Sequence, residues 1–121
     1  KDVSYEGKKI KVSDATNLVR GRKICFVLDT LMNDNCFKAA KNADLLVSEA
    51  CFLKSDEDKA QERKHLTATQ AASISKKAHA KKLILTHISQ RYANKENLIL
   101  EEAKKIFKNT ALAKDFMKVE V

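Results

Sequence analysis

The chain has 121 residues, enough for one domain of ordinary size or for part of a larger one. It carries 24 Lys and Arg against 16 Asp and Glu, and the net charge of +8 suits a polyanionic partner, with nucleic acid the first candidate. Much of the lysine stands beside glutamate in helical stretches, so the charge by itself favours nucleic acid only modestly. No apolar run approaches a membrane span or a signal peptide, and we expect a soluble, cytoplasmic protein with no membrane partner.

The cysteines argue against a zinc ribbon. Cys25, Cys36 and Cys51 are odd in number and lack Cys-x-x-Cys spacing, a pattern typical of reduced intracellular thiols. The chain has no Pro and two Gly, and it contains no low-complexity linker and no internal repeat. We therefore expect residues 1–121 to belong to a single domain.

The first part of the chain alternates strand and helix patterns. In order, we expect a hairpin from Val3 to Val12 with Gly7 in its turn, a polar loop from Ser13 to Arg22 that can hold a helical turn, a buried strand from Ile24 to Leu28, a short helix from Asn35 to Asn42, and a second buried strand from Asp44 to Ser48.

The second part continues the alternation. A charged helix from Ser55 to Lys64 is expected with Ser55 as its N-cap. Thr67 and Gln70 form a capping-box pattern that opens a helix to about His79. The remaining expected elements are a buried strand from Leu83 to Thr86, a helix capped by Asn94 and ending at Phe107 with Leu98, Ile99, Ala103 and Ile106 inward, and a final strand from Phe116 to Val121.

Strands that alternate with helices predict an α/β fold with a largely parallel sheet. The three buried strands are closed by Asp29, Glu49 and His87. Because the carboxyl ends of parallel strands meet at one edge of a sheet, and ligands bind at that edge, these side chains are candidates for a site.

Two pairs of residues carry candidate chemistry. Asp29 and His87 together offer an oxygen and a nitrogen donor for zinc or manganese, although each alone is more often a turn aspartate or a hydrogen-bonded histidine. Glu49 and His65 form a possible carboxylate–imidazole pair for acid–base work, and their contact depends on the fold. Without a catalytic role, Glu49 would form a salt bridge in a loop and His65 would be a surface histidine.

The loop after His87 adds polar groups. Arg91 offers a planar donor fork to a phosphate, Ser89 offers a hydroxyl, and Tyr92 offers a ring for stacking. Such triplets are common in loops, so this one matters only because of its neighbours.

Four segments in order resemble tRNase Z, the metallo-β-lactamase-fold endoribonuclease that removes the 3′ trailer from precursor tRNA. They are Leu28-Asp29-Thr30, the run Ala43 to Leu53, His65-Leu66-Thr67-Ala68, and the run Leu83 to Tyr92. The resemblance extends from about Val3 to the end of the chain, and the ending Ala113 to Met117 also fits. It implies the C-terminal half of a four-layer αβ/βα metallo-β-lactamase sandwich.

The resemblance also implies roles. Asp29 matches an aspartate that bridges two zinc ions, and His87 matches the last ligand histidine. Glu49 and His65 match a pair that assists proton transfer to the leaving 3′-oxygen. Thr67, Ser89 and Arg91 match positions near the RNA, and the intact enzyme is expected to act on precursor tRNA as a homodimer.

This chain departs from the family pattern. Leu28 stands where the family has glycine, and Ser48 and Cys51 replace the first and last residues of a His-Glu-Ala-Thr motif. The family's His-x-His-x-Asp-His motif and another ligand histidine belong to an N-terminal half that these residues do not include. We therefore expect residues 1–121 to be a partial domain that is inactive alone.

Two rival functions stay open. One is a metallo-β-lactamase-fold phosphodiesterase for small substrates. Measuring turnover of precursor tRNA and of a chromogenic phosphodiester side by side would distinguish this function from tRNA processing. The other is a non-catalytic fragment or subunit that needs a partner chain. This hypothesis is favoured if the chain binds no zinc and exposes an apolar surface.

Overall fold

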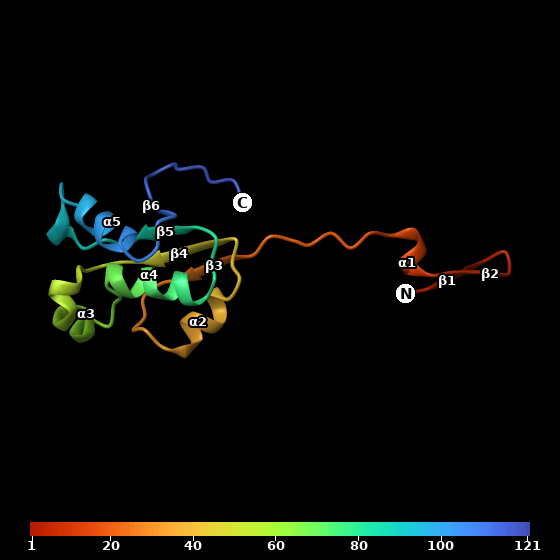
Figure 1. The fold of residues 1–121 in the computed structure, drawn as a ribbon, viewed down its shortest axis with the longest axis horizontal. Helices are drawn as coiled ribbons and strands as arrows, with labels where there is room; N and C mark the ends of the chain where they lie inside the picture. Colours follow the sequence, from red (N-terminus) through yellow and green to blue (C-terminus); the bar gives the residue numbers. More distant parts are fainter.

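Four short parallel strands form the centre of the structure, a computed structural model that describes residues 1–121 (Figure 1). The strands are β3 (Ile24–Val27), β4 (Leu45–Glu49), β5 (Leu83–Thr86) and β6 (Thr110–Leu112), and they lie side by side in this order. Every neighbouring pair is parallel, with Val27 beside Ser48 and Ser48 beside Leu85. This register brings the ends of three strands to one edge.

Helices join successive strands and cover the sheet. The α-helices after β3 are α2 (Asp34–Ala40), α3 (Glu57–Arg63), α4 (Ala68–Lys77) and α5 (Asn97–Lys104), with 3₁₀ turns η1 (Lys54–Asp56) and η2 (Gln90–Tyr92). Figure 1 shows α2 and α4 along one side of the strands. Ile74 of α4 is fully buried in one core with Leu46 and Leu83 of the sheet. None of the helices has the length and apolarity to cross a membrane.

The predicted α/β alternation is confirmed, but the strand β3 is only half buried. Cys25 and Val27 face the core, whereas Ile24 and Phe26 are 50% and 65% exposed. β3 is an edge strand with no partner on one side, and its face that carries Ile24 and Phe26 is also uncovered. The expectation of a buried strand holds for β5 and is wrong for one face of β3.

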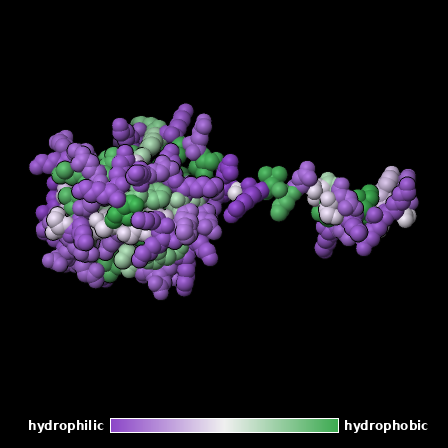
Figure 2. Space-filling view, in the orientation of Figure 1, coloured by the Kyte–Doolittle hydropathy of each residue, from purple (hydrophilic) through white to green (hydrophobic).

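The chain before β3 forms an N-terminal arm, residues 1–23, in which every residue is exposed. It contains the predicted hairpin, β1 (Val3–Tyr5) with β2 (Lys8–Ile10), and a helical turn α1 (Val12–Ala15). Gly7 occupies the hairpin turn at φ +71°, a conformation that glycine adopts without strain. Figures 1 and 2 show this arm projecting from the α/β unit, with apolar surface along it.

The predicted final strand from Phe116 to Val121 is wrong. The last strand of the sheet is β6 (Thr110–Leu112), which pairs with β5. The alternating segment pairs with no strand, and Phe116 has φ +61° and is fully exposed. An alternating pattern alone does not make a strand, because the backbone N–H and C=O groups of a strand need partners on a neighbouring strand.

Two helix starts also differ from expectation. Ser55 lies in η1, and α3 begins after Asp56 with no side-chain cap. Asn94 takes a left-handed conformation ahead of α5, which begins only at Asn97 after Glu96. Leu98, the second residue of α5, is 40% exposed rather than inward. The capping box of Thr67 and Gln70 is confirmed, with both hydrogen bonds present.

Candidate active site

The candidate site lies at the carboxyl edge of the sheet. Asp29 and His87 each follow a strand end with positive φ, 48° and 54°, so the chain turns sharply after β3 and after β5. Non-glycine residues take this conformation uncommonly, and Asp and His do so more readily than most. Asp29 Oδ1 lies 3.4 Å from His87 Nδ1, so two segments 58 positions apart bring their donors together.

Glu49, the last residue of β4, is fully buried beside them. Its Oε1 accepts a hydrogen bond from the backbone N–H of Thr30 at 2.7 Å, and its Oε2 accepts one from the N–H of Leu66 at 3.2 Å. These donors stabilise a buried carboxylate and hold it in one orientation.

His65 is held against this carboxylate. Its Nδ1 lies 2.9 Å from Glu49 Oε2, and its side chain is 24% exposed. The backbone reaches this position because Lys64 ends α3 in a left-handed conformation and the N–H of His65 donates to Ala60. A hydrogen bond to the carboxylate through Nδ1 leaves Nε2 for another partner.

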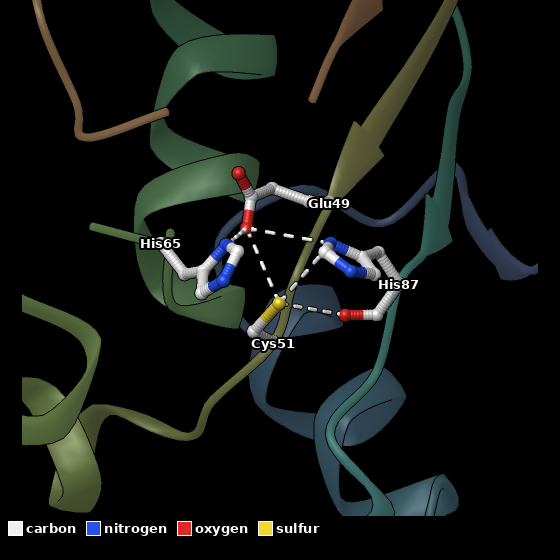
Figure 3. Close-up of side chains that lie close together, drawn as sticks. All are labelled: Glu49, Cys51, His65 and His87. Atoms are coloured by element: carbon white, nitrogen blue, oxygen red, sulfur yellow. Dashed lines mark hydrogen bonds and ion pairs between the residues drawn. The ribbon is translucent and has the colours of Figure 1, made fainter. Parts of the chain in front are cut away.

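Cys51 is also a member of the site, although the sequence indicated it only as a reduced thiol and as a departure from the family pattern. Its Sγ lies 3.2 Å from Glu49 Oε2, 3.4 Å from His87 Nδ1 and 2.8 Å from the His87 carbonyl oxygen (Figure 3). Burial, and next the hydrogen bond with Glu49, raise the pKa of the Cys51 thiol. The signal in the sequence was its place two residues after a strand-end glutamate.

A cavity of about 250 Å³ opens onto this cluster. Its lining includes Cys51, His65, His87 and Ser89, together with Phe52, Arg63, Ile88 and Gln90. The imidazole rings and the thiol therefore face a space that a ligand can enter, while Glu49 lies behind them.

The three expected substrate contacts are placed very differently. Thr67 is fully buried and its hydroxyl accepts from the N–H of Gln70, so its expected contact with a substrate does not fit this geometry. Ser89 lines the cavity, and its Oγ accepts from the N–H of Arg91. The Arg91 side chain is half-exposed, with Nη1 3.8 Å from Asp56 Oδ1.

Tyr92 is not available for base stacking, contrary to expectation, because it is buried. Its hydroxyl donates to Asp56 Oδ2 at 2.6 Å and accepts from the N–H of Leu53 at 3.1 Å. Burial and the bond to Asp56 raise the pKa of Tyr92, and Lys59 with Tyr92 lowers the pKa of Asp56. The ring anchors the loop that follows His87.

The donors at this edge fit a zinc ion in part. Oxygen and nitrogen ligands bound at tetrahedral zinc lie about 3.4 Å apart, which follows from bond lengths near 2.0–2.2 Å. The Asp29–His87 separation of 3.4 Å matches that value. Two donors are fewer than the three protein ligands of a typical catalytic zinc site.

Curated relatives cover most of this chain, whereas no family model matches it. Ribonuclease Z of Archaeoglobus fulgidus is 46% identical over 102 residues, which are 84% of this chain and 33% of the relative. Ribonuclease Z of Prochlorococcus marinus strain AS9601 is 38% identical over an alignment of 130 positions, gaps included, that covers 96% of this chain and 41% of the relative. The chain thus spans about a third to two fifths of the length of these relatives.

Solved structures agree on the fold. The metallo-β-lactamase fold protein YhfI from Bacillus subtilis superposes with a TM-score of 0.68 and 28% identity, over 75% of this chain and 36% of that one. The short form of human tRNase Z gives a TM-score of 0.61 and 34% identity, over 90% of this chain and 35% of that one. The resemblance seen in the sequence is confirmed: the chain is a homologue of ribonuclease Z over most of its residues, and its α/β unit is part of a metallo-β-lactamase fold.

Proposed function

We propose that this chain provides one side of the active site of a zinc-dependent endoribonuclease that removes the 3′ trailer from precursor tRNA. The observation that carries the proposal is the buried carboxylate of Glu49 holding His65 at 2.9 Å, next to the Asp29–His87 pair. The relatives named ribonuclease Z support the reaction class. Residues 1–121 would be one partial domain of that enzyme.

Asp29 and His87 would hold zinc. When bound, zinc would polarise the phosphate and lower the pKa of water, which supplies the nucleophile for phosphodiester hydrolysis. The side chains of Asp29 and His87 are 74% and 49% exposed, so both remain accessible to an ion and to the remaining ligands.

His65 would protonate the departing 3′-oxygen. Glu49 positions the imidazole through Nδ1, because the carboxylate is buried and already fixed by two backbone donors. The proton would move from Nε2 of His65 to the oxygen as the phosphorus–oxygen bond breaks, leaving a 3′-hydroxyl on the tRNA. Glu49 acts only through His65 and is a positioning residue.

Ser89 and Arg91 would contact phosphates of the substrate. Ser89 lines the cavity beside His87, and the guanidinium of Arg91 is half-exposed at the end of the same loop. The net charge of +8 would hold the RNA through its phosphates, so binding should weaken as salt rises. Precursor tRNA and a second copy of the intact enzyme are the proposed partners.

A chimera tests the proposal. In ribonuclease Z of Archaeoglobus fulgidus, these residues would replace the matching segment, and cleavage of precursor tRNA and zinc content would be measured. We expect activity in the chimera and none in the isolated chain. Asp29→Ala or His87→Ala should abolish cleavage with loss of zinc, and His65→Ala should slow cleavage roughly 100- to 10,000-fold with zinc retained.

His79→Ala is the matched control, because His79 follows α4 at the opposite end of the sheet and lines a different cavity. It should leave both readouts unchanged. Full zinc content together with near-normal cleavage in the Asp29 or His87 variant would refute the proposed ligands. An inactive but folded and zinc-loaded parent chimera would refute the nuclease activity of this segment.

A second candidate is a phosphodiesterase for small substrates on the metallo-β-lactamase fold, the fold that YhfI shares. Side-by-side turnover of precursor tRNA and a chromogenic phosphodiester by the active chimera separates the two. Preference for the small ester, with no trailer removal, would establish the alternative.

A further inference from the structure

Four side chains at the carboxyl edge, Glu49, Cys51, His65 and His87, bring potential ligand atoms within 4.8 Å of one another (Figure 3). They come from the end of β4, the segment before α4 and the residue after β5. The proposed nuclease mechanism uses three of them and gives no role to Cys51. A thiol beside two imidazoles and a carboxylate is the donor set that zinc prefers.

Two separations within this thiol cluster match a single tetrahedral ion. Sulfur and nitrogen ligands on one zinc lie about 3.5 Å apart, and two imidazole ring centres about 5 Å apart, given bond lengths near 2.3 and 2.0 Å. Cys51 Sγ is 3.4 Å from His87 Nδ1, and the ring centres of His65 and His87 are 5.1 Å apart at 78°. To bind an ion, the 2.9 Å separation of Glu49 Oε2 and His65 Nδ1 would have to widen, and the 4.0 Å separation of Glu49 Oε2 and His87 Nδ1 would have to shorten.

We propose that Glu49, Cys51, His65 and His87 form a binding site for one zinc-class divalent ion, with Cys51 as its thiolate ligand. The ion enters through the cavity lined by Cys51, His65 and His87. On binding, the S–H bond of Cys51 breaks, its proton passes to solvent, and a metal–sulfur bond forms with no change of oxidation state. This binding does not depend on RNA cleavage.

Occupancy of this site has a consequence that rests on the proposed function. The ion needs His87 Nδ1, which also faces Asp29 Oδ1 at 3.4 Å, so an ion in the thiol cluster competes with one held by Asp29. It also takes a lone pair of His65, which could then no longer carry a proton. Excess metal should therefore inhibit the nuclease, and replacement of Cys51 should relieve that inhibition.

Cobalt titration of the full chain tests the site directly. Under reducing conditions and in the absence of RNA, one equivalent of Co²⁺ should produce a thiolate-to-cobalt charge-transfer band in the near ultraviolet and the visible bands of tetrahedral cobalt. Native mass spectrometry should count one ion per chain. Zn²⁺ should displace the cobalt and remove the bands.

Cys51→Ser should lose the charge-transfer band, while the matched control Cys25→Ser, at a buried thiol within β3, should keep it. Serine retains a donor for the His87 carbonyl, which favours folding of the variant. Cadmium NMR of the unaltered chain gives a second measurement, because its shift reports sulfur ligation without any substitution. No charge-transfer band, or a band that persists in Cys51→Ser, overturns the proposal.

The outcome is separable from that of the nuclease. A cobalt–thiolate site in the chain together with an inactive chimera would support the metal site and refute the function. An active chimera, together with an isolated chain that shows no thiolate band, would support the function and refute the metal site.

Discussion

The two ends of the central sheet each hold a carboxylate with two close donors, yet they offer different chemistry. At the amino edge, Asp44 accepts from the N–H of Lys23 at 2.8 Å and from Nζ of Lys81 at 2.6 Å. At the carboxyl edge, Glu49 accepts from two backbone N–H groups and faces His65. A solvated lysine neutralises the first carboxylate, and no Lys or Arg forms an ion pair with the second.

The neutralising partner decides what each edge can do. A cavity of about 290 Å³ at the amino edge is lined entirely by polar residues and glycine, and Lys81 lies among them. Lysine stays charged at neutral pH and binds metals poorly, so an ion pair of this kind is a structural feature. Histidine changes charge near neutral pH and ligates metals, so the carboxyl edge can move protons or bind ions.

Removing the buried carboxylate should have the largest effect on stability. Glu49→Ala leaves the N–H groups of Thr30 and Leu66 without their acceptors, and each buried unpaired donor is costly. We expect the free energy of unfolding to fall by about 3 kcal/mol, measured by urea denaturation of the chain.

Glu49→Gln is the matched variant for this measurement. Its amide oxygen can still accept from one of the two backbone donors, so it should lose about half as much stability. Asp44→Ala at the amino edge should cost clearly less than Glu49→Ala, since water can replace the lost acceptor at the surface. Equal losses at the two edges would show that burial does not distinguish these carboxylates.

The layout of the carboxyl edge followed from the sequence because it depends on local patterns and on one topological rule. Short apolar runs ending at Glu49 and near His87 predicted strands, and parallel pairing of those strands brings their ends together. The resemblance to tRNase Z then indicated roles for Asp29 and His65, whose places depend on contacts far apart in the chain.

Other features depend on tertiary packing that no local pattern encodes. Cys51 contacts His87 because the turn after β5 places that histidine against the thiol. The apolar and polar residues from Phe116 to Val121 alternate as in a strand, but the strand that pairs with β5 is Thr110–Leu112. Tyr92 carries a ring suited to stacking and is buried instead by its bonds to Asp56 and Leu53.

The loop that follows His87 gives a prediction of intermediate size. Tyr92→Phe keeps the buried ring and removes the hydroxyl, which leaves the N–H of Leu53 without an acceptor and Asp56 without one donor. We expect a loss of about 1–2 kcal/mol in the free energy of unfolding. Tyr5→Phe in the exposed N-terminal arm is the control and should change nothing measurable. A loss as small as that of Tyr5→Phe would mean that the Asp56 contact does not stabilise the loop.

The smallest expected effect is a pH dependence at the amino edge. The hydrogen bond from Lys81, and next that from the Lys23 backbone, lower the pKa of Asp44 from 3.8 to about 2. Because the folded-state pKa lies below the ordinary value, the contribution of Asp44 to stability is complete above pH 3.8 and is lost as the pH falls towards about 2. Asp44→Asn keeps an acceptor for the backbone and removes the charge, so its unfolding free energy should change less steeply over this window than that of the unaltered chain. Parallel curves for the two proteins in acid denaturation would show that Lys81 contributes nothing through Asp44, and the contrast between the edges would then rest on burial alone.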